Sequence, residues 1–227
     1  MVLGDTPYMV RGGQEDYKRV FYSDQNRALT KPISILPGYG VLPGGTVMGI
    51  VTEGRVGYYV PYAAEGPNTP GAGFQKAWPG ITYVTLDLTT DKVCQIMLAD
   101  SYRFAVDDHV AATDTDDTET HAGAITAIDR TTYSHIAVLT STNNFAAATV
   151  AKGGNVYIQT AAGDPFTKAQ GILFSAVDTG YGEKAKGAQA TLVLSNAILY
   201  KAALLGYNSD VKTDLGNTED GKYVILK

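Results

Sequence analysis

The segment from Gly38 to Tyr62 constrains the fold of this chain more than any other segment. A stretch rich in glycine and proline leads into an apolar run, 46–52, and after a turn at 53–55 a second run covers 56–62. In the second run the large side chains recur at every other position, at Val56, Tyr58, Val60 and Tyr62. This period of two predicts a β-hairpin whose second strand places these four side chains on one face. The segment contains no nucleophile and no metal-ligand spacing, so it favours a structural or binding role.

The acidic balance of the chain restricts its partners. Among 227 residues, 23 are acidic and 18 are basic, which gives a formal net charge of −5 and a pI of about 5.1. A surface that binds nucleic acid needs a basic stripe, so this balance argues against direct nucleic-acid binding. The length allows one large β domain or two smaller ones. The 15 tyrosines suit half-buried strands and wet interfaces equally, because each joins an apolar ring to a hydroxyl group.

The single cysteine, Cys94, excludes an intramolecular disulfide, so packing must stabilise the fold. It lies in the apolar run 93–98, where we expect a buried and unreactive thiol. The N-terminus has no basic region followed by an apolar stretch, and no run approaches the roughly 18 apolar residues of a membrane span. We therefore expect a soluble protein that is made in the cytoplasm and does not contact a membrane.

Short apolar runs separated by turns continue along the chain and predict a mainly β fold of small barrel or sandwich modules with little helix. Residues 190–205 are ambiguous between strand and helix, and we favour a strand through Tyr200 followed by a short helical turn. The other predicted strands are an antiparallel pair, 81–88 and 92–98, and the single runs 102–110, 123–128, 133–140, 155–160 and 222–226.

Residues 1–35 are polar and mixed, and we interpret them as an extended N-terminal arm that lies on a partner. A helical turn at 15–21 and a disordered tail are the alternatives. Tyrosines and basic residues in this arm are candidates for contact with the partner: Tyr8, Arg11, Tyr17, Lys18, Arg19, Tyr22, Arg27 and Lys31.

One central stretch holds all three histidines beside several carboxylates, and it is the best candidate for a metal site, since zinc and iron accept both ligand types. The spacing is poor, however, and the loop 113–121 lacks the turn glycine and terminal carboxylate of an EF-hand. We favour a solvated acidic loop and predict no bound metal; the alternative is a metal-dependent hydrolase. The residues concerned are His109, His121, His135, Asp107, Asp108, Asp114, Asp116, Asp117 and Glu119.

Other catalytic patterns fit poorly. Ser134 and His135 are neighbours in a predicted strand, so they point to opposite faces and cannot form a nucleophile–base pair. Gly38 and Gly40 resemble the start of a dinucleotide-binding loop, but Pro43 takes the sixth position and a strand follows. We therefore predict no catalytic residue and no cofactor.

A likeness to a known family is distributed over most of the chain. It is carried by the segments 38–62, 101–109, 123–133, 171–178 and 194–200, among them Ser101-Tyr-Arg-Phe-Ala-Val-Asp-Asp-His and Leu194-Ser-Asn-Ala-Ile-Leu-Tyr. On these segments the chain resembles the head decoration proteins, or capsid cement proteins, of tailed bacteriophages. In smaller members of that family the first strand pair is followed soon by an element similar to 165–178, whereas here about a hundred residues intervene. We therefore predict a discontinuous core, 36–65 plus 160–227, with an inserted β subdomain at 66–159.

The resemblance implies a structural, non-enzymatic virion protein that binds the outer surface of the capsid and stabilises the shell. The implied partners are the major capsid protein and further copies of this chain, with a trimer favoured and a dimer possible. The implied location is the capsid exterior, after synthesis in the host cytoplasm. A carbohydrate-binding β module on a virion is a further alternative, since exposed tyrosines can stack on sugars.

Overall fold

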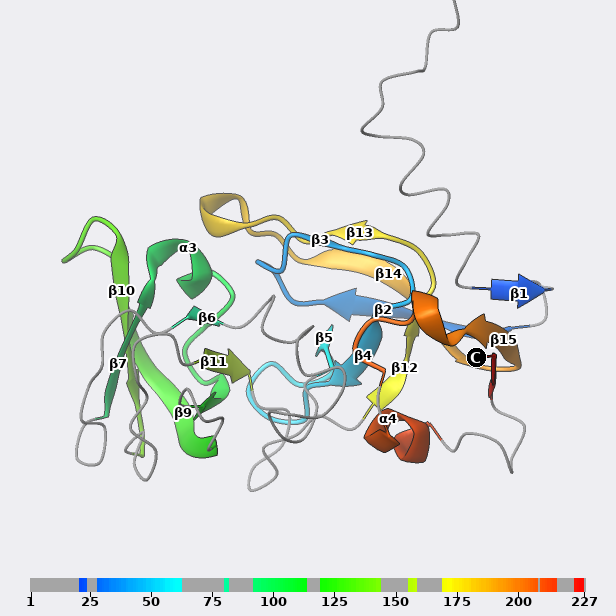
Figure 1. The fold of residues 1–227 in the computed structure, drawn as a ribbon. Coiled ribbons are helices and arrows are strands. Elements are labelled where there is room, and N and C mark those ends of the chain that lie inside the picture. The colour runs from blue at the N-terminus through cyan, green and yellow to red at the C-terminus, as the bar shows by residue number, and fades with distance from the viewer. Residues whose placement is uncertain are drawn as a thin grey trace, which may run out of the picture.

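The computed structural model describes residues 21–23, 28–62, 80–81, 92–113, 119–143, 155–158, 169–207, 209–215 and 223–226. Within these residues the protein is mainly β, as the sequence predicted, and its helices are short (Figure 1). The two largest parts are a closed five-stranded barrel and a six-stranded sheet, which lie side by side. None of the helices described has the length and apolar character needed to cross a membrane.

The barrel combines strands from two separate parts of the sequence. Its order is β12-β14-β2-β5-β4, and all its pairs are antiparallel except β2 with β5. The longest ladder joins β2 to β14 along their whole length. The bounds of the strands are β2 Leu29–Ile35, β4 Val47–Ile50, β5 Tyr59–Pro61, β12 Ala169–Leu173 and β14 Ala188–Ser195.

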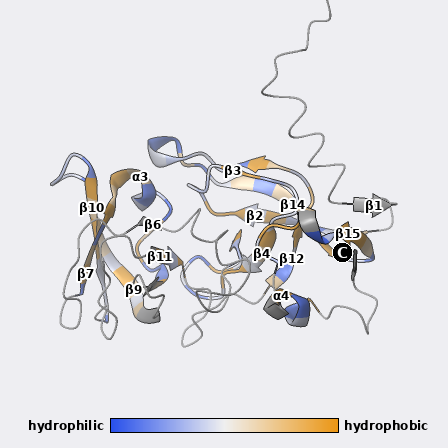
Figure 2. Ribbon diagram, viewed as in Figure 1, coloured by the Kyte–Doolittle hydropathy of each residue, from blue (hydrophilic) through white to orange (hydrophobic). Residues whose placement is uncertain are grey.

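Neighbouring residues of the barrel strands pack into two different hydrophobic clusters. Met48, Leu173 and Leu192 belong to one buried cluster, while the adjacent Val47, Ile172 and Val193 belong to another. This follows from the two-residue period of a strand, which sends successive side chains to opposite faces. The second cluster is completed by residues from α4 Ser209–Asp214, the 3₁₀ helix η3 Lys201–Ala203 and strand β15 Ala197–Tyr200. Apolar stretches accordingly recur in strands of both parts of the molecule (Figure 2).

The six-stranded sheet comes entirely from the sequence between the two groups of barrel strands. Its order is β6-β11-β8-β9-β10-β7, and every pair in it is antiparallel. The short helix α3 Leu98–Ser101 directly follows β7. The bounds of its strands are β6 Gly80–Ile81, β7 Val93–Met97, β8 His109–Thr113, β9 Glu119–Asp129, β10 Ile136–Ser141 and β11 Asn155–Ile158.

The barrel and the sheet share one hydrophobic core. Ile35, Leu36 and Met48 of the barrel region belong to the same buried cluster as Ile96 and Leu139 of the sheet. All five side chains are at most 1% exposed. Because burial of apolar surface is the main stabilising contribution in folding, the two parts form one packed body rather than two linked bodies.

Two smaller sheets complete the described part of the fold. Strand β15 pairs with β1 Phe21–Ser23 on one side and, in parallel, with β16 Tyr223–Leu226 on the other. Strand β3 Val41–Leu42 pairs with β13 Val177–Asp178, which is followed by the 3₁₀ helix η2 Gly182–Lys184.

The predicted hairpin is confirmed, but its predicted face is wrong in its first half. Strands β4 and β5 pair as expected, and Val60 and Tyr62 are buried. Val56 and Tyr58, in contrast, are 65% and 41% exposed. The reason is a turn: the N–H of Gly57 donates to the carbonyl of Val51, and Gly57 has a φ of 85°, so the alternation starts only at Tyr59.

The predicted strand 102–110 is also wrong, because local turns replace most of it. Helix α3 ends in two tight turns, in which the N–H groups of Arg103 and Phe104 donate to the carbonyls of Asp100 and Ser101. The carboxylate of Asp108 then accepts the N–H of Ala105, and strand β8 begins only after it. Such local hydrogen bonds give the backbone an alternative to a sheet ladder.

Most of the remaining strand predictions are confirmed, with shifted ends. Strands β9, β11 and β16 lie where strands were expected, and the ambiguous segment 190–205 forms strands through Tyr200 followed by η3. Of the predicted strand 81–88 only Ile81 is described, in β6, which pairs with β11, while β7 pairs with β10. Residues 82–91 lie outside the description, so the expected pairing of 81–88 with 92–98 stays a prediction. Ser134 and His135 lie in a bend before β10 rather than in a strand.

The position of β2 limits the predicted arm. Leu29–Ile35 is a barrel strand, so only the residues before it remain available for an arm. Residues 1–20 and 24–27 lie outside the described part of the chain.

Candidate functional site at the barrel–sheet junction

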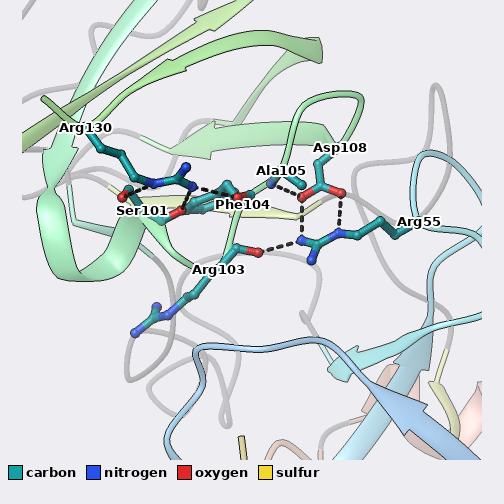
Figure 3. A network of polar contacts seen from close by, with 7 residues as sticks. All are labelled: Arg55, Ser101, Arg103, Phe104, Ala105, Asp108 and Arg130. Carbon is teal, nitrogen blue, oxygen red and sulfur yellow. Dashed lines mark hydrogen bonds and ion pairs between the residues drawn. The ribbon is translucent and has the colours of Figure 1, made fainter. Parts of the chain in front are cut away.

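The most elaborate polar structure in the described residues lies where the barrel meets the sheet. We define the junction network as the side chains of Arg55, Asp100, Arg103, Asp108 and Arg130 with their bonded partners. Figure 3 draws the four members other than Asp100. Arg55 comes from the β4–β5 connection, and the other four come from α3, from the α3–β8 connection and from the position directly after β9. The network therefore joins residues that are far apart in the sequence.

Arg55 binds Asp108 with two parallel hydrogen bonds. Its Nε lies 2.8 Å from Oδ1 and its Nη2 lies 2.6 Å from Oδ2, and Nη2 also donates to the carbonyl of Arg103 at 2.5 Å. The Asp108 side chain is fully buried and the Arg55 side chain is 23% exposed. This two-point geometry is specific to a guanidinium facing a carboxylate and fixes the hairpin turn against the sheet.

Arg103 is the most buried cation of the network. Its side chain is 5% exposed, its Nη2 lies 2.9 Å from Asp100 Oδ1, and its Nε donates to the carbonyl of Gly38 at 2.9 Å. The rings of Tyr39 and Tyr181 lie 5.6 Å and 5.7 Å from its guanidinium carbon, within cation–π range. The Tyr181 hydroxyl donates to Asp100 Oδ1 at 3.0 Å. Arg103 therefore connects α3 to the barrel loop at Gly38 and to the segment before η2.

Arg130 closes the carbonyl end of α3. Its Nη2 donates to the carbonyls of Ser101 and Phe104 at 2.8 Å and 2.9 Å, and its Nε donates to Ser101 Oγ at 2.9 Å. The Tyr102 ring lies 5.1 Å from the guanidinium carbon. The last carbonyls of a helix have no partner within the helix, and a cation there also interacts favourably with the helix dipole.

Two glycines allow the backbones to approach at this junction. A Cβ at Gly54 would lie 2.5 Å from the carbonyl oxygen of Asp107, and one at Gly38 would lie 2.8 Å from Arg103 Cγ and 3.1 Å from its backbone nitrogen. Both glycines also have positive φ values, 70° and 89°. Only glycine meets both requirements without strain.

Burial changes the acidity of the neutral groups near the network. Burial raises the pKa of the Tyr39 hydroxyl to about 12, although the charge of Arg103 opposes the rise. The pKa of Tyr181 is also raised, first by burial and then by the nearby Asp100 carboxylate. Both hydroxyls therefore stay protonated at neutral pH and are poor general bases. The network is suited to holding surfaces together rather than to moving protons.

The predicted contact residues are only partly covered by the structure. Tyr8, Arg11, Tyr17, Lys18, Arg19 and Arg27 lie outside the described residues. Tyr22 is in β1, which pairs with β15. Lys31 is an exposed residue of β2, and its Nζ lies 3.5 Å from the Tyr59 hydroxyl.

The structure does not bring the described members of the His/Asp cluster together as a set of three metal ligands. Asp108 is bound to Arg55, His135 is exposed in the bend before β10, and His121 lies in β9. His109 Nδ1 lies 3.1 Å from Glu53 Oε2, a residue that the sequence did not select. Among the described residues no three potential ligands come close enough to hold a metal ion; Asp114, Asp116 and Asp117 lie outside them.

The expected buried thiol is confirmed. Cys94 is 1% exposed, and burial raises the pKa of its thiol to about 12. A protonated thiol without access to solvent is not a nucleophile.

The sequence did not point to the junction network, although one signal for it was present. In the predicted strand 102–110, the positions that share a face with Asp108 are Tyr102, Phe104, Val106 and Val110. A carboxylate on an otherwise apolar face requires a buried partner. The partner itself, Arg55, is 53 residues away and could not be identified without the fold.

Comparisons of this chain with protein-family models, with curated proteins and with solved structures found no match.

Proposed function

We propose that this protein is a non-enzymatic structural protein of a phage virion, which binds the outer surface of the capsid and stabilises the shell. The observation that supports this proposal best is the junction, where a shared hydrophobic core, the Arg55–Asp108 ion pair and the hydrogen bond from Arg103 to the carbonyl of Gly38 join two β bodies into one. A brace that transmits load must not change shape when it is pulled. A pre-organised body also loses less entropy on binding than a flexible one.

The mode of attachment in this proposal is many small contacts. A contact that is weak on its own becomes strong when several copies bind one lattice, because later contacts form at high effective concentration. The basic residues before β2 would meet an acidic capsid surface, with Arg11, Lys18, Arg19 and Arg27 as the principal contacts. Homo-oligomers on the capsid exterior, trimers or dimers, are part of the same proposal.

The test is binding of the purified full-length protein to shells assembled from the major capsid protein encoded by the same phage. Co-sedimentation and cryo-EM of the shells should show the protein on their outside and a higher melting temperature of the decorated shells. Absence of binding to expanded shells would refute the proposed function. Stoichiometric zinc, iron or manganese in the purified protein would instead favour the hydrolase, and specific binding on a glycan array would favour the carbohydrate module.

The role of the basic residues needs a matched control. The variant R11E/K18E/R19E/R27E changes the net charge by as much as K184E/K186E/K201E/K212E, whose four lysines are exposed elsewhere on the molecule. We expect the first variant to lose shell binding and the second to keep it. Equal loss in both would assign the effect to net charge rather than to the predicted arm.

A further inference from the structure

We propose that the edge of β15 accepts strand β1 from a second copy of this chain, so that two copies exchange their N-terminal segments. The inference concerns a contact between copies and stands whether or not the protein binds a capsid. It starts from the three-stranded sheet β1-β15-β16, in which the central strand is flanked by a segment from each end of the described chain.

Strand β15 is fixed by the core and does not depend on β1 for its position. Ala197 is 4% exposed and Leu199 is fully buried, and both pack in the cluster that contains Val47 and Val193 of the barrel. Asn196, with a φ of 59°, marks the bend between β14 and β15. If β1 leaves, β15 therefore keeps its shape and presents an unpaired edge, which is a template for another strand.

The attachment of β1 is small by comparison. It covers Phe21 to Ser23, pairs Phe21 with Leu199 and Ser23 with Ile198, and has an irregular register between the two pairs. Strand β2, in contrast, pairs with β14 along a ladder from Ile35 to Leu29. Release of β1 therefore breaks few backbone hydrogen bonds and leaves the barrel intact.

The chain between β1 and the barrel is long enough for exchange. From Ser23 to Ala28 an extended chain reaches up to about 17 Å. A β1 strand can then reach the β15 edge of an adjacent copy while its own β2 stays in its own barrel. Short connections of this kind, between an element and a stable body, are where proteins exchange segments.

The structure favours β1 of a second copy as the strand on the β15 edge, because β1 already pairs with β15 within one chain. The same residues in the same register would pair with β15 in either arrangement, so exchange replaces each contact by an identical one. Reciprocal exchange closes a two-fold dimer and leaves both edges of β15 paired in each copy. Its population should rise with protein concentration, since the competing arrangement is intramolecular.

The test uses cysteine pairs placed on the two strands. In the variant S23C/I198C a disulfide can form within one chain, whereas a mixture of the single variants S23C and I198C can form one only between chains. We expect the mixture to give a covalent dimer on mild oxidation, in a yield that rises with protein concentration. The wild-type chain should give none, because Cys94 is buried.

The matched control is the pair S34C and Q189C on the ladder between β2 and β14, where the side chains of Ser34 and Gln189 already lie 2.9 Å apart. Its single variants should give no dimer when mixed, since exchange there would require the barrel to open. Dimers from both mixtures, or from neither, would overturn the proposal. If β1 instead pairs only with a strand of a different protein, neither mixture will give a dimer in this assay.

The unmodified chain provides a second measurement that does not depend on the folding of variants. In a mixture of ¹⁵N-labelled and ¹³C-labelled full-length chains, exchange predicts isotope-edited NOEs between the Ser23 region of one chain and the Ile198 region of the other. NOEs that arise only within single chains, at concentrations where dimers are present by mass, would refute the exchange.

Discussion

Removal of Arg55 should destabilise the protein more than removal of the carboxylate that it binds. In the variant Arg55→Met the Asp108 carboxylate stays fully buried and keeps only the N–H of Ala105 as a described donor. Breaking a buried ion pair by removing one partner typically costs about 3–5 kcal/mol. Because Arg55 itself is 23% exposed, the pair is not fully shielded from solvent, and we expect the lower end of that range, about 3 kcal/mol.

Removal of the carboxylate instead of the arginine leaves a group that is less costly in free energy to keep without its partner. In Asp108→Asn the side-chain oxygen can still accept from Ala105, and the partly exposed Arg55 guanidinium can turn toward water. We expect a loss of about 2 kcal/mol, the usual value for a hydrogen bond to a charged group. The double variant should lose about 3 kcal/mol rather than the sum, which gives a coupling energy of about 2 kcal/mol.

The assay is urea unfolding at pH 7 and 25 °C, followed by far-UV circular dichroism. With an m value of about 3 kcal/mol/M, a loss of 3 kcal/mol lowers the midpoint by about 1 M. The control is Lys186→Met, because Lys186 lies 3.5 Å from Asp178 and both side chains are more than half exposed. Its midpoint should not move. The reasoning is refuted if Arg55→Met shifts the midpoint no more than the control does, or if the two single losses simply add.

Three further changes probe separate features. Gly38→Ala should destabilise the protein by about 1–2 kcal/mol more than Gly57→Ala. Both glycines have positive φ, but only the Cβ of an alanine at position 38 would clash with Arg103. Urea unfolding of the two variants compares their free energies directly. Arg130→Met should cost about 2 kcal/mol through its lost hydrogen bonds to the Ser101 hydroxyl and to the carbonyls of Ser101 and Phe104. Arg130→Lys should not restore the loss, since an ammonium cannot reproduce the planar two-nitrogen geometry; urea unfolding measures both variants. Cys94 should resist a thiol reagent at pH 8 until urea unfolds the chain. Burial raises the pKa of this thiol from 9.0 to about 12, so the thiol of the unfolded chain ionises at lower pH than that of the folded chain. The free energy of unfolding should therefore fall as the pH rises from about 9 toward 12. A smaller fall over this pH range in Cys94→Ala would confirm this, and an equal fall would contradict it.

Much of the fold could be predicted because strands leave a local pattern. The hairpin of β4 and β5, the strand β9 and the sequence of strands and helical turn after Ala190 all follow from short apolar runs with a period of two, bounded by turn residues. The failures occur where a local hydrogen bond overrides the pattern. At Val56 and Tyr58 a turn continues past the expected strand start, and before His109 the Asp108 carboxylate holds the backbone in a turn.

The candidate site was harder to predict because its parts meet only in three dimensions. Sequence reasoning selected the histidines and acids of one stretch, which share a region of the chain, but among the described residues no three of them come together as metal ligands. The junction network instead pairs Arg55 with Asp108 and Arg103 with the carbonyl of Gly38. No local pattern indicates which of 18 basic residues will face a given buried carboxylate.

The sequence of Gly38 to Tyr62 determined by itself that a hairpin would form there, because alternation and turn residues act over a few neighbouring positions. The sequence also determined that Cys94 would be buried, since it lies in an apolar strand. Only the tertiary structure decided that this hairpin closes a barrel with strands more than a hundred residues away, and that its turn is fixed to the neighbouring sheet by Arg55. Long-range pairing depends on which surfaces fit and which charges can be buried together, and both are properties of the packed chain.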